Sequence, residues 1–234
     1  MKIKGRLKKI IEYIPVGSRV ADIGTDHGLI PVYLVESGIA GFVIASDLNK
    51  GSLEKAIKKV EKRNLQSHIE TRLGDGLKVL SLKEVDVIII AGMGGILIAK
   101  ILEEGKNIAK TVKRLVLQPM RDSDYLRKYL IENGYKICDE DLVKENQKYY
   151  EIIIAEQGRQ KVKKDIYYEI GERLIEKNHP LLKEFLQHKI NKLTKILNKL
   201  SEMNEKRKKL EKKIKEFEVL LNGLEMPSNS FYNG

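Results

Sequence analysis

The amino-acid sequence predicts an α/β domain with a mostly parallel sheet, followed by a separate α-helical region. Through about residue 155, short apolar runs rich in β-branched residues alternate with longer stretches of helical periodicity, as in strand-helix-strand units around a parallel sheet. From about residue 160 onward, apolar residues recur only at helical spacing. We therefore expect two domains, residues 1–157 and residues 158–234.

Seven apolar runs predict the strands of this sheet. Five of them alternate with helical patterns and should be parallel. They are residues 19–23, 42–46, 69–73, 85–91 and 114–118. The helical patterns cover residues 28–38, 50–64, 94–104 and 122–133. The last two runs, 135–143 and 149–156, are separated by a polar segment that is too short for a crossover between parallel strands, so we expect an antiparallel hairpin.

Two apolar stripes with alternating steps of four and three residues predict coiled-coil helices in the C-terminal region. The first stripe is Leu186, Ile190, Leu193, Leu197 and Leu200. The second stripe is Leu210, Ile214, Phe217, Leu221 and Leu224. Between them the register slips, because the same spacing would place Asn204 and Arg207 in the core.

Such a slip is expected either at the turn of a helical hairpin or at a stammer in one long helix. We favour the hairpin, because a single amphipathic helix would leave its apolar stripe uncovered. The heptads leave open whether the helices pair within one chain or between two. We therefore expect either a monomer or a homodimer.

The net charge of +11 is concentrated in the C-terminal region. Residues 158–234 hold 18 Lys and Arg against 11 Asp and Glu, whereas residues 1–157 hold 26 against 22. A positive excess favours a polyanionic partner, because binding neutralises phosphates and releases counterions. A solvated, lysine-rich helix face accounts for the charge equally well.

Several classes of protein are disfavoured by composition. No apolar run approaches the length of about 20 residues that a membrane span needs, so we expect a cytoplasmic protein that binds no membrane. Cys138 is the only cysteine, which excludes an internal disulfide. The four histidines lack Cys or His partners at metal-site spacing, so we expect no metal.

The stretch after the first predicted strand, DIGTDHG, resembles a nucleotide-binding glycine turn with an acid in its middle. If Gly24 is aligned with the first glycine of the dinucleotide fingerprint, Asp26 and Leu29 occupy the other two glycine positions. A carboxylate about 4 Å from a phosphate costs roughly 4 kcal/mol at an effective dielectric of about 20. S-adenosylmethionine has no phosphate and carries two cationic groups, so the turn suits this cofactor. The residues expected to bind it here are Asp22, Gly24, Asp26, His27 and Gly28.

The ends of the next three predicted strands also suit a nucleoside. Asp47 follows Gly24 at about the spacing of an acid that holds ribose hydroxyls, with capping of the next helix as the alternative. Asp75 is expected to accept a hydrogen bond from the adenine amino group, although Gly-Asp-Gly alone is also a turn. Met93 offers an apolar contact to the adenine. The neighbouring residues expected to line the cofactor are Leu48, Gly74, Gly76, Ala91 and Gly92.

Taken together, these motifs resemble a known family. DIGTDHG-x-x-P-x-x-L is preceded by the basic segment RLKKI and followed in order by SDLN, GDG, AGMGG and LQP. The whole set is similar to that of the bacterial tRNA adenine N1-methyltransferases of the TrmK type, which act on position 22. The resemblance implies a Rossmann-like class I methyltransferase domain joined to a C-terminal coiled-coil region. It also implies S-adenosylmethionine as cofactor and tRNA as partner.

The reaction implied by the resemblance is methyl transfer to N1 of an adenine. That nitrogen carries a free lone pair, so the enzyme needs geometry and charge stabilisation more than a base. We expect Asp26 to stabilise the cationic product as the catalytic carboxylate, with a structural role as the alternative. The residues expected to bind the substrate are Gln118, Met120, Arg6, Lys8 and Lys9.

Two other functions stay open on the sequence alone. The first is a methyltransferase with the same cofactor that acts on another RNA or on a small molecule; the basic C-terminal region argues against a small molecule. The second is a non-enzymatic RNA-binding scaffold in which the coiled coil serves dimerisation. The intact set of acids and glycines at the strand ends argues against this scaffold.

Overall fold

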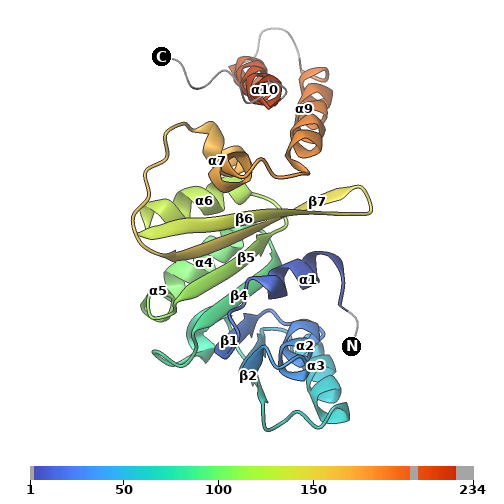
Figure 1. Ribbon diagram of the computed structural model, residues 1–234, viewed down its shortest axis with the longest axis vertical. Helices are drawn as coiled ribbons and strands as arrows, with labels where there is room; N and C mark the ends of the chain where they lie inside the picture. The colour runs from blue at the N-terminus through green and yellow to red at the C-terminus, as the bar shows by residue number, and fades with distance from the viewer. Residues whose placement is uncertain (1–2, 201–204, 225–234) are drawn as a thin grey trace. The chain divides into compact units, whose positions relative to one another are not determined.

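The computed structural model describes residues 3–200 and 205–224. The chain forms two compact units, Met1–Val162 and Lys163–Gly234 (Figure 1). The first contains the sheet and the second is entirely helical in its described residues.

The first unit is built on a seven-stranded sheet in the order β3-β2-β1-β4-β5-β7-β6. The strands are β1 (Ser18–Ile23), β2 (Ala40–Asp47), β3 (Ile69–Leu73), β4 (Val87–Met93), β5 (Arg114–Pro119), β6 (Tyr135–Glu145) and β7 (Lys148–Gln157). The first five strands pair in parallel, whereas β7 is antiparallel to both β5 and β6. The predicted fold class, a Rossmann-like sheet closed by an antiparallel hairpin, is confirmed.

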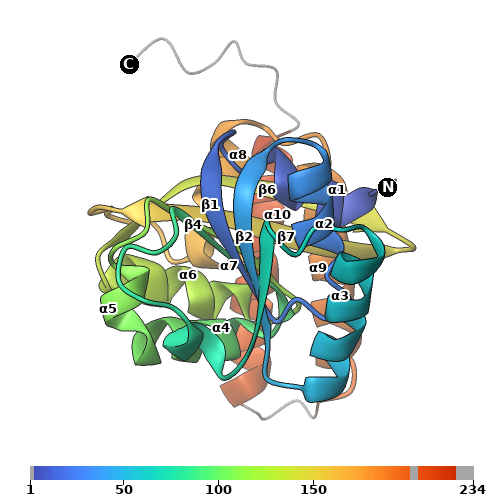
Figure 2. The same cartoon turned by 90° about the horizontal axis from the view of Figure 1, so that it is seen from below.

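Helices cover both faces of this sheet (Figure 2). One face carries α1 (Gly5–Glu12), α2 (Leu29–Glu36) and α3 (Lys50–Lys62). The other carries η1 (Gly76–Val79), α4 (Gly95–Glu104), α5 (Lys106–Ala109) and α6 (Ser123–Glu132). Successive strand residues point to opposite faces, so Val20 packs under the first group of helices while Ala21 packs under the second. Because both faces are covered, the central strands are continuously apolar.

Strand β4 has an irregular pairing with β5 at its C-terminal end. Its pairing with β5 shifts register between Ala91 and Met93, and the residue between them, Gly92, has a φ of 79°. Glycine adopts this left-handed conformation without steric cost, so the strand can bulge there. The strand consequently runs two residues beyond the apolar run that predicts it.

A buried ion cluster joins α6 to the hairpin. The Arg127 side chain is 1% exposed, its Nε donates to Glu140 Oε1 at 2.6 Å, and its Nη2 donates to Glu151 Oε2 at 2.6 Å. Burial alone would lower the pKa of this guanidinium, but the two carboxylates outweigh burial and raise it. Ser123, at the start of α6, donates to the other oxygen of Glu151 at 2.7 Å. The cluster therefore fixes α6 on β6 and β7.

The second unit contains α7 (Ile166–Ile170), α8 (Glu172–Glu176), α9 (Leu182–Leu197) and α10 (Glu205–Gly223). Helices α9 and α10 pack against each other, and their buried residues Leu186, Ile190, Ile214 and Phe217 belong to the two predicted stripes. The stripes thus pair within the chain, as the favoured helical hairpin requires. The finer coiled-coil geometry stays a prediction, and Asn204 lies outside the described residues.

Replacing Arg127 with methionine should strongly destabilise the first unit, because it leaves the carboxylates of Glu140 and Glu151 buried without their cation. We expect a loss of about 3–5 kcal/mol in the free energy of unfolding, measured by urea denaturation. Lys128→Ala is the control, since its ion pair with Glu132 is exposed and should contribute less than about 1 kcal/mol. Equal effects of the two substitutions would contradict this account of the cluster.

Candidate active site

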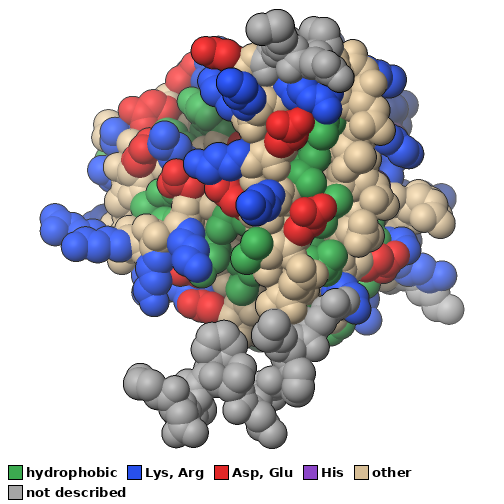
Figure 3. Space-filling view, turned by 90° about the horizontal axis from the view of Figure 1, so that it is seen from above, with side chains coloured by type: hydrophobic (Ala, Val, Ile, Leu, Met, Phe, Trp, Pro, Cys, Tyr) green, Lys and Arg blue, Asp and Glu red, His purple; other side chains and the backbone are tan. Residues whose placement is uncertain are grey.

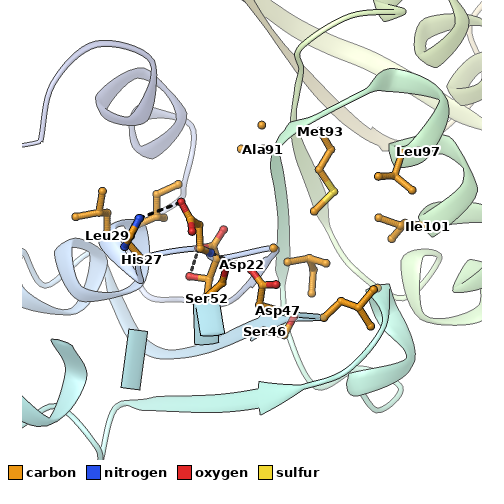
Figure 4. A pocket seen from close by; sticks show the side chains of 18 of the residues that line it. Asp22, His27, Leu29, Ser46, Asp47, Ser52, Ala91, Met93, Leu97 and Ile101 are labelled. Atoms are coloured by element: carbon orange, nitrogen blue, oxygen red, sulfur yellow. Dashed lines mark hydrogen bonds and ion pairs between the residues drawn. The ribbon is translucent and has the colours of Figure 1, made fainter. Parts of the chain in front are cut away.

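A cavity of about 540 Å³ lies at the C-terminal ends of the parallel strands (Figure 4). Its lining includes the ends of β1 and β4, and the strand order reverses between these two strands. Ligands bind at such points in open α/β sheets, and the volume is within the usual range for small-molecule sites, roughly 300–1,000 Å³. Asp22 and Asp47 lie on one side, and Met93, Leu97 and Ile101 lie on the other. The cavity therefore has a carboxylate wall and an apolar wall.

The loop after β1 is shaped by left-handed backbone conformations. Gly24 and Asp26 have φ values of 76° and 47°. The backbone N–H groups of Gly24 and Thr25 both donate to the carbonyl of Ser46, at 2.8 and 2.9 Å, which ties the loop to the end of β2. A Cβ at Gly24 would overlap the methyl of Met93. Glycine suits this position, because a φ of 76° is strained for other residues and a Cβ would displace the end of the Met93 side chain.

Asp22 is a buried carboxylate in the wall of the cavity. Its Oδ2 accepts a hydrogen bond from Thr25 Oγ1 at 2.7 Å. Burial raises the pKa of Asp22, the hydrogen bond from Thr25 lowers it, and the nearby negative charge of Asp47 raises it, so that the pKa lies at about 6. A positive charge inside the cavity would relieve this unfavourable burial.

Asp47 is held by two backbone amides. Its Oδ1 accepts from the N–H of Asn49 at 2.7 Å, and its Oδ2 accepts from the N–H of Asp26 at 3.2 Å. The N-cap of α3 is Asn49, whose side chain accepts from the N–H of Ser52 at 3.1 Å. The alternative role for Asp47, capping this helix, is therefore wrong. Each carboxylate oxygen of Asp47 keeps a lone pair for a ligand.

Asp75 stands at the far end of the carboxylate wall, after β3. Its side chain is half exposed and pairs with Lys78, whose Nζ lies 2.6 Å from Oδ2. The hydrogen bond from Lys78 lowers the pKa of Asp75, so this carboxylate stays charged. The glycines on both sides allow a tight turn, since a Cβ at Gly74 would overlap Val79.

Asp26 and His27 form the rim of the cavity. Their side chains are 65% and 46% exposed, and Asp26 Oδ2 lies 3.4 Å from His27 Nε2. Asp26 does not cap α2, whose N-cap is Gly28. Its carboxylate is therefore accessible to a molecule that approaches the cavity from solvent.

Most residues expected to bind the cofactor line the cavity. They are Asp22, Gly24, Asp26, His27, Asp47, Leu48, Gly74, Asp75, Gly76, Ala91, Gly92 and Met93. Gly28 does not; a Cβ there would lie 3.0 Å from the Cβ of Ala56, so Gly28 lets α2 pack against α3. A role of Gly28 in cofactor binding stays a prediction.

The residues expected to bind the substrate are more dispersed. Arg6 lines the cavity, whereas Lys8 is exposed on the same helix and does not. Lys9 forms ion pairs with Glu12 at 2.8 Å and Asp141 at 3.5 Å. Gln118 is fully buried, and its Nε2 donates to the carbonyl of Pro119 at 2.9 Å. Met120 is half exposed beside the cavity, where its N–H donates to the carbonyl of Met93.

Several further residues line the cavity that the motifs did not predict. They are Leu7, Ile23, Thr25, Leu29, Ile30, Ser46, Ser52, Leu97 and Ile101. Thr25 and Ser46 lie within the DIGTDHG and SDLN motifs, and their hydroxyl groups could have indicated that they line the cavity. Ser46 Oγ is buried without a hydrogen-bond partner in the described part of the chain and can serve a ligand. Leu97 and Ile101 are one helical turn apart on α4, a spacing that core packing explains equally well.

The described part of the chain lacks two other features, a cluster of metal ligands and a membrane-spanning helix. Across residues 3–200 and 205–224, no three His, Cys, Asp or Glu side chains group as metal ligands. No helix in the described part of the chain combines the length and apolarity of a membrane span.

The sequence and structure are similar to those of known methyltransferases. The family model described as TrmK, tRNA (adenine(22)-N(1))-methyltransferase, matches residues 20–219. The tRNA (adenine(22)-N(1))-methyltransferase of Bacillus subtilis is 44% identical over 158 residues, which is 68% of this chain and 66%, just under two thirds, of that protein.

Solved structures extend the similarity to nearly the whole chain. A Streptococcus pneumoniae protein in complex with S-adenosyl-L-methionine is 35% identical with a TM-score of 0.86, over 92% of this chain and 98% of that one. TrmK of M. capricolum, in complex with S-adenosyl-homocysteine, is 28% identical with a TM-score of 0.84, over 96% and 100%. The resemblance seen in the motifs is confirmed: this chain belongs to the TrmK family of tRNA (adenine(22)-N(1))-methyltransferases.

Proposed function

We propose that this chain transfers a methyl group from S-adenosylmethionine to N1 of adenine 22 in tRNA. The observation that carries the proposal is the cavity at the strand ends, where four aspartates converge on a glycine-lined space. Family membership indicates the type of reaction, and the residues that line the cavity are the candidates for binding the cofactor and for catalysis. When bound, the cofactor supplies an electrophilic methyl group on a sulfonium.

The lining residues fit this cofactor. The sulfonium and ammonium groups are cationic, so the charges of Asp22 and Asp26 favour them, whereas a diphosphate would be repelled. Asp47 would accept from the ribose hydroxyls, since its two carboxylate oxygens are oriented by backbone amides. Asp75 would accept from the adenine amino group, and Met93 would offer an apolar contact to the adenine ring.

Asp26 is the proposed catalytic residue. Methylation of N1 leaves a positive charge on the adenine, and a carboxylate beside that nitrogen stabilises the charge as it develops. The exposed position of Asp26 on the rim supports this role, because a base delivered from solvent reaches the rim first. No side chain needs to remove a proton, since the N1 lone pair is free.

The substrate makes further demands on the protein. A base in folded tRNA is stacked, and exposing it costs a few kcal/mol. We assign the methyltransferase domain to residues 1–157 and a tRNA-binding role to residues 158–234, whose positive excess supplies phosphate contacts. On the face shown in Figure 3, lysine and arginine side chains are interspersed with acidic ones, so the contacts would be spread along the surface. With tRNA as substrate, we place the protein in the cytoplasm as a monomer or homodimer.

The activity is tested by incubating unmodified tRNA with labelled S-adenosylmethionine and analysing the nucleosides. We expect 1-methyladenosine, and we expect none with the same tRNA carrying guanine at position 22. Methylation that persists in the guanine variant would mean that another adenine is the target. Absence of any methylated nucleoside with several unmodified tRNAs would refute the proposal.

Asp26→Asn should retain the fold and most of the cofactor affinity, because Asp22 keeps its charge inside the cavity. It should lose turnover on the order of a hundredfold, because it removes the charge that stabilises the product adenine. Single-turnover methylation measures the rate, and calorimetric titration measures the affinity. Glu54→Gln, on the exposed face of α3 outside the cavity, is the control and should change neither. Full turnover in Asp26→Asn would remove this residue from the mechanism.

Cofactor affinity should depend on pH through Asp22. The pKa of its carboxyl is raised from 3.8 to about 6 in the fold, so the group is largely neutral at pH 5 and charged at pH 7. A cationic ligand favours the charged form, so affinity should fall about tenfold from pH 7 to pH 5.

Asp22→Asn should abolish most of this pH dependence. The variant should also be more stable than wild type at pH 7, by up to about 3 kcal/mol, because burying the charged form destabilises the fold. That advantage should shrink as the pH falls from about 6 to below 4, because wild-type Asp22 becomes neutral first in the folded chain and then, below pH 4, in the unfolded chain as well. Equal pH slopes of affinity in wild type and variant would contradict the role of Asp22.

A further inference from the structure

The carboxylate wall explains how the cavity accepts cations, but S-adenosylmethionine also carries an anion, the carboxylate of its methionine part. Four aspartates line the cavity and repel that group. Among the described lining residues, Arg6 is the single lysine or arginine. His27 carries a charge only when it is protonated, whereas a guanidinium is always charged.

The surroundings of Arg6 fix its position. Its backbone N–H donates to Glu145 Oε1 at 2.6 Å, and its Nη1 donates to Glu145 Oε2 at 3.2 Å. The guanidinium carbon lies 4.8 Å from the centre of the Tyr150 ring, which gives a cation–π contact. Strand β6 and strand β7 thus hold the side chain from two directions.

Glu145 also completes the start of α1. The N-cap residue Lys4 has no side-chain hydrogen bond to the helix, and the first turn contains no acid. The carboxylate of Glu145 takes the place of a cap by accepting from the second N–H of the helix. A Cβ at Gly5, whose φ is 56°, would overlap this carboxylate, so the close approach requires glycine.

One edge of the guanidinium has no hydrogen-bond partner among residues 3–200 and 205–224. Nη1 is engaged by Glu145, while Nε is buried and donates to no described residue, and no described residue accepts from Nη2. The Nε–H and Nη2–H bonds are parallel and form one of the two edges with which arginine grips a carboxylate through two hydrogen bonds. A buried donor with no partner is costly, so a ligand that accepts from it is favoured.

We propose that Arg6 binds the methionine carboxylate of the cofactor through its Nε–Nη2 edge, and that Glu145 and Tyr150 are positioning residues for this contact. The inference rests on the proposed cofactor and reassigns Arg6 from the substrate to the cofactor. It makes α1 part of the cofactor site. The tip of the β6–β7 hairpin contributes to holding the helix there, through the contacts of Glu145 and Tyr150 with Arg6.

The test compares two ligands that differ only in this group, S-adenosylmethionine and its decarboxylated form, by calorimetric titration of the full chain. Wild type should bind the decarboxylated form about ten- to a hundredfold more weakly. Arg6→Met should weaken S-adenosylmethionine binding by a similar factor and should change binding of the decarboxylated form by less than about threefold. Arg6→Lys should fall between wild type and Arg6→Met, because it keeps the charge and loses the two-bond edge.

Lys8→Met is the matched control, since Lys8 is exposed on the same helix and does not line the cavity. It should bind both ligands as wild type does. Equal weakening of both ligands in Arg6→Met and in Arg6→Lys would overturn the proposal, because it would mean that Arg6 only supports the fold. If wild type binds neither ligand, the cofactor assignment itself fails, and this inference fails with it.

Discussion

The crowding of carboxylates at one edge of the sheet is the constraint from which the site follows. Asp22, Asp26, Asp47 and Asp75 line one cavity, and burial raises the pKa of Asp22 to about 6. Like charges brought together in this way oppose folding unless protons or a ligand offset them. A cationic nucleoside offsets them when it binds. The repulsion among these carboxylates destabilises the fold, and binding of the cationic cofactor reduces that repulsion.

The fold creates this crowding through close backbone approach. The loop after β1 is hydrogen-bonded to the carbonyl of Ser46, and Gly24 lies against the side chain of Met93 at the end of β4. The register irregularity between Ala91 and Met93 lies at the same edge, and Gly92 and Met93 line the cavity. Parallel pairing brings the strand ends to one edge of the sheet. Arg6 supplies the opposite charge from a helix that lies outside the sheet.

The sequence predicted the fold class, the family and the strand ends that form the cavity, because apolar periodicity and turn residues are local signals. It did not predict contacts between distant residues. Arg6 is held by Glu145, which lies 139 residues away, and Lys9 forms an ion pair with Asp141. Gly28 lies close to Ala56 in the next helix, a contact that its motif does not indicate. The spacing of residues within one segment does not predict contacts with residues that are distant in the sequence.

The most direct test of the central claim is a calorimetric comparison of S-adenosylmethionine with a dinucleotide, NAD⁺, on the full chain at low ionic strength. Both ligands contain adenosine, and they differ in the sign of the charge presented to the loop after β1. The account predicts saturable binding of S-adenosylmethionine and at least roughly hundredfold weaker binding of NAD⁺, as a repulsion of a few kcal/mol requires. Equal or tighter binding of NAD⁺ would contradict it.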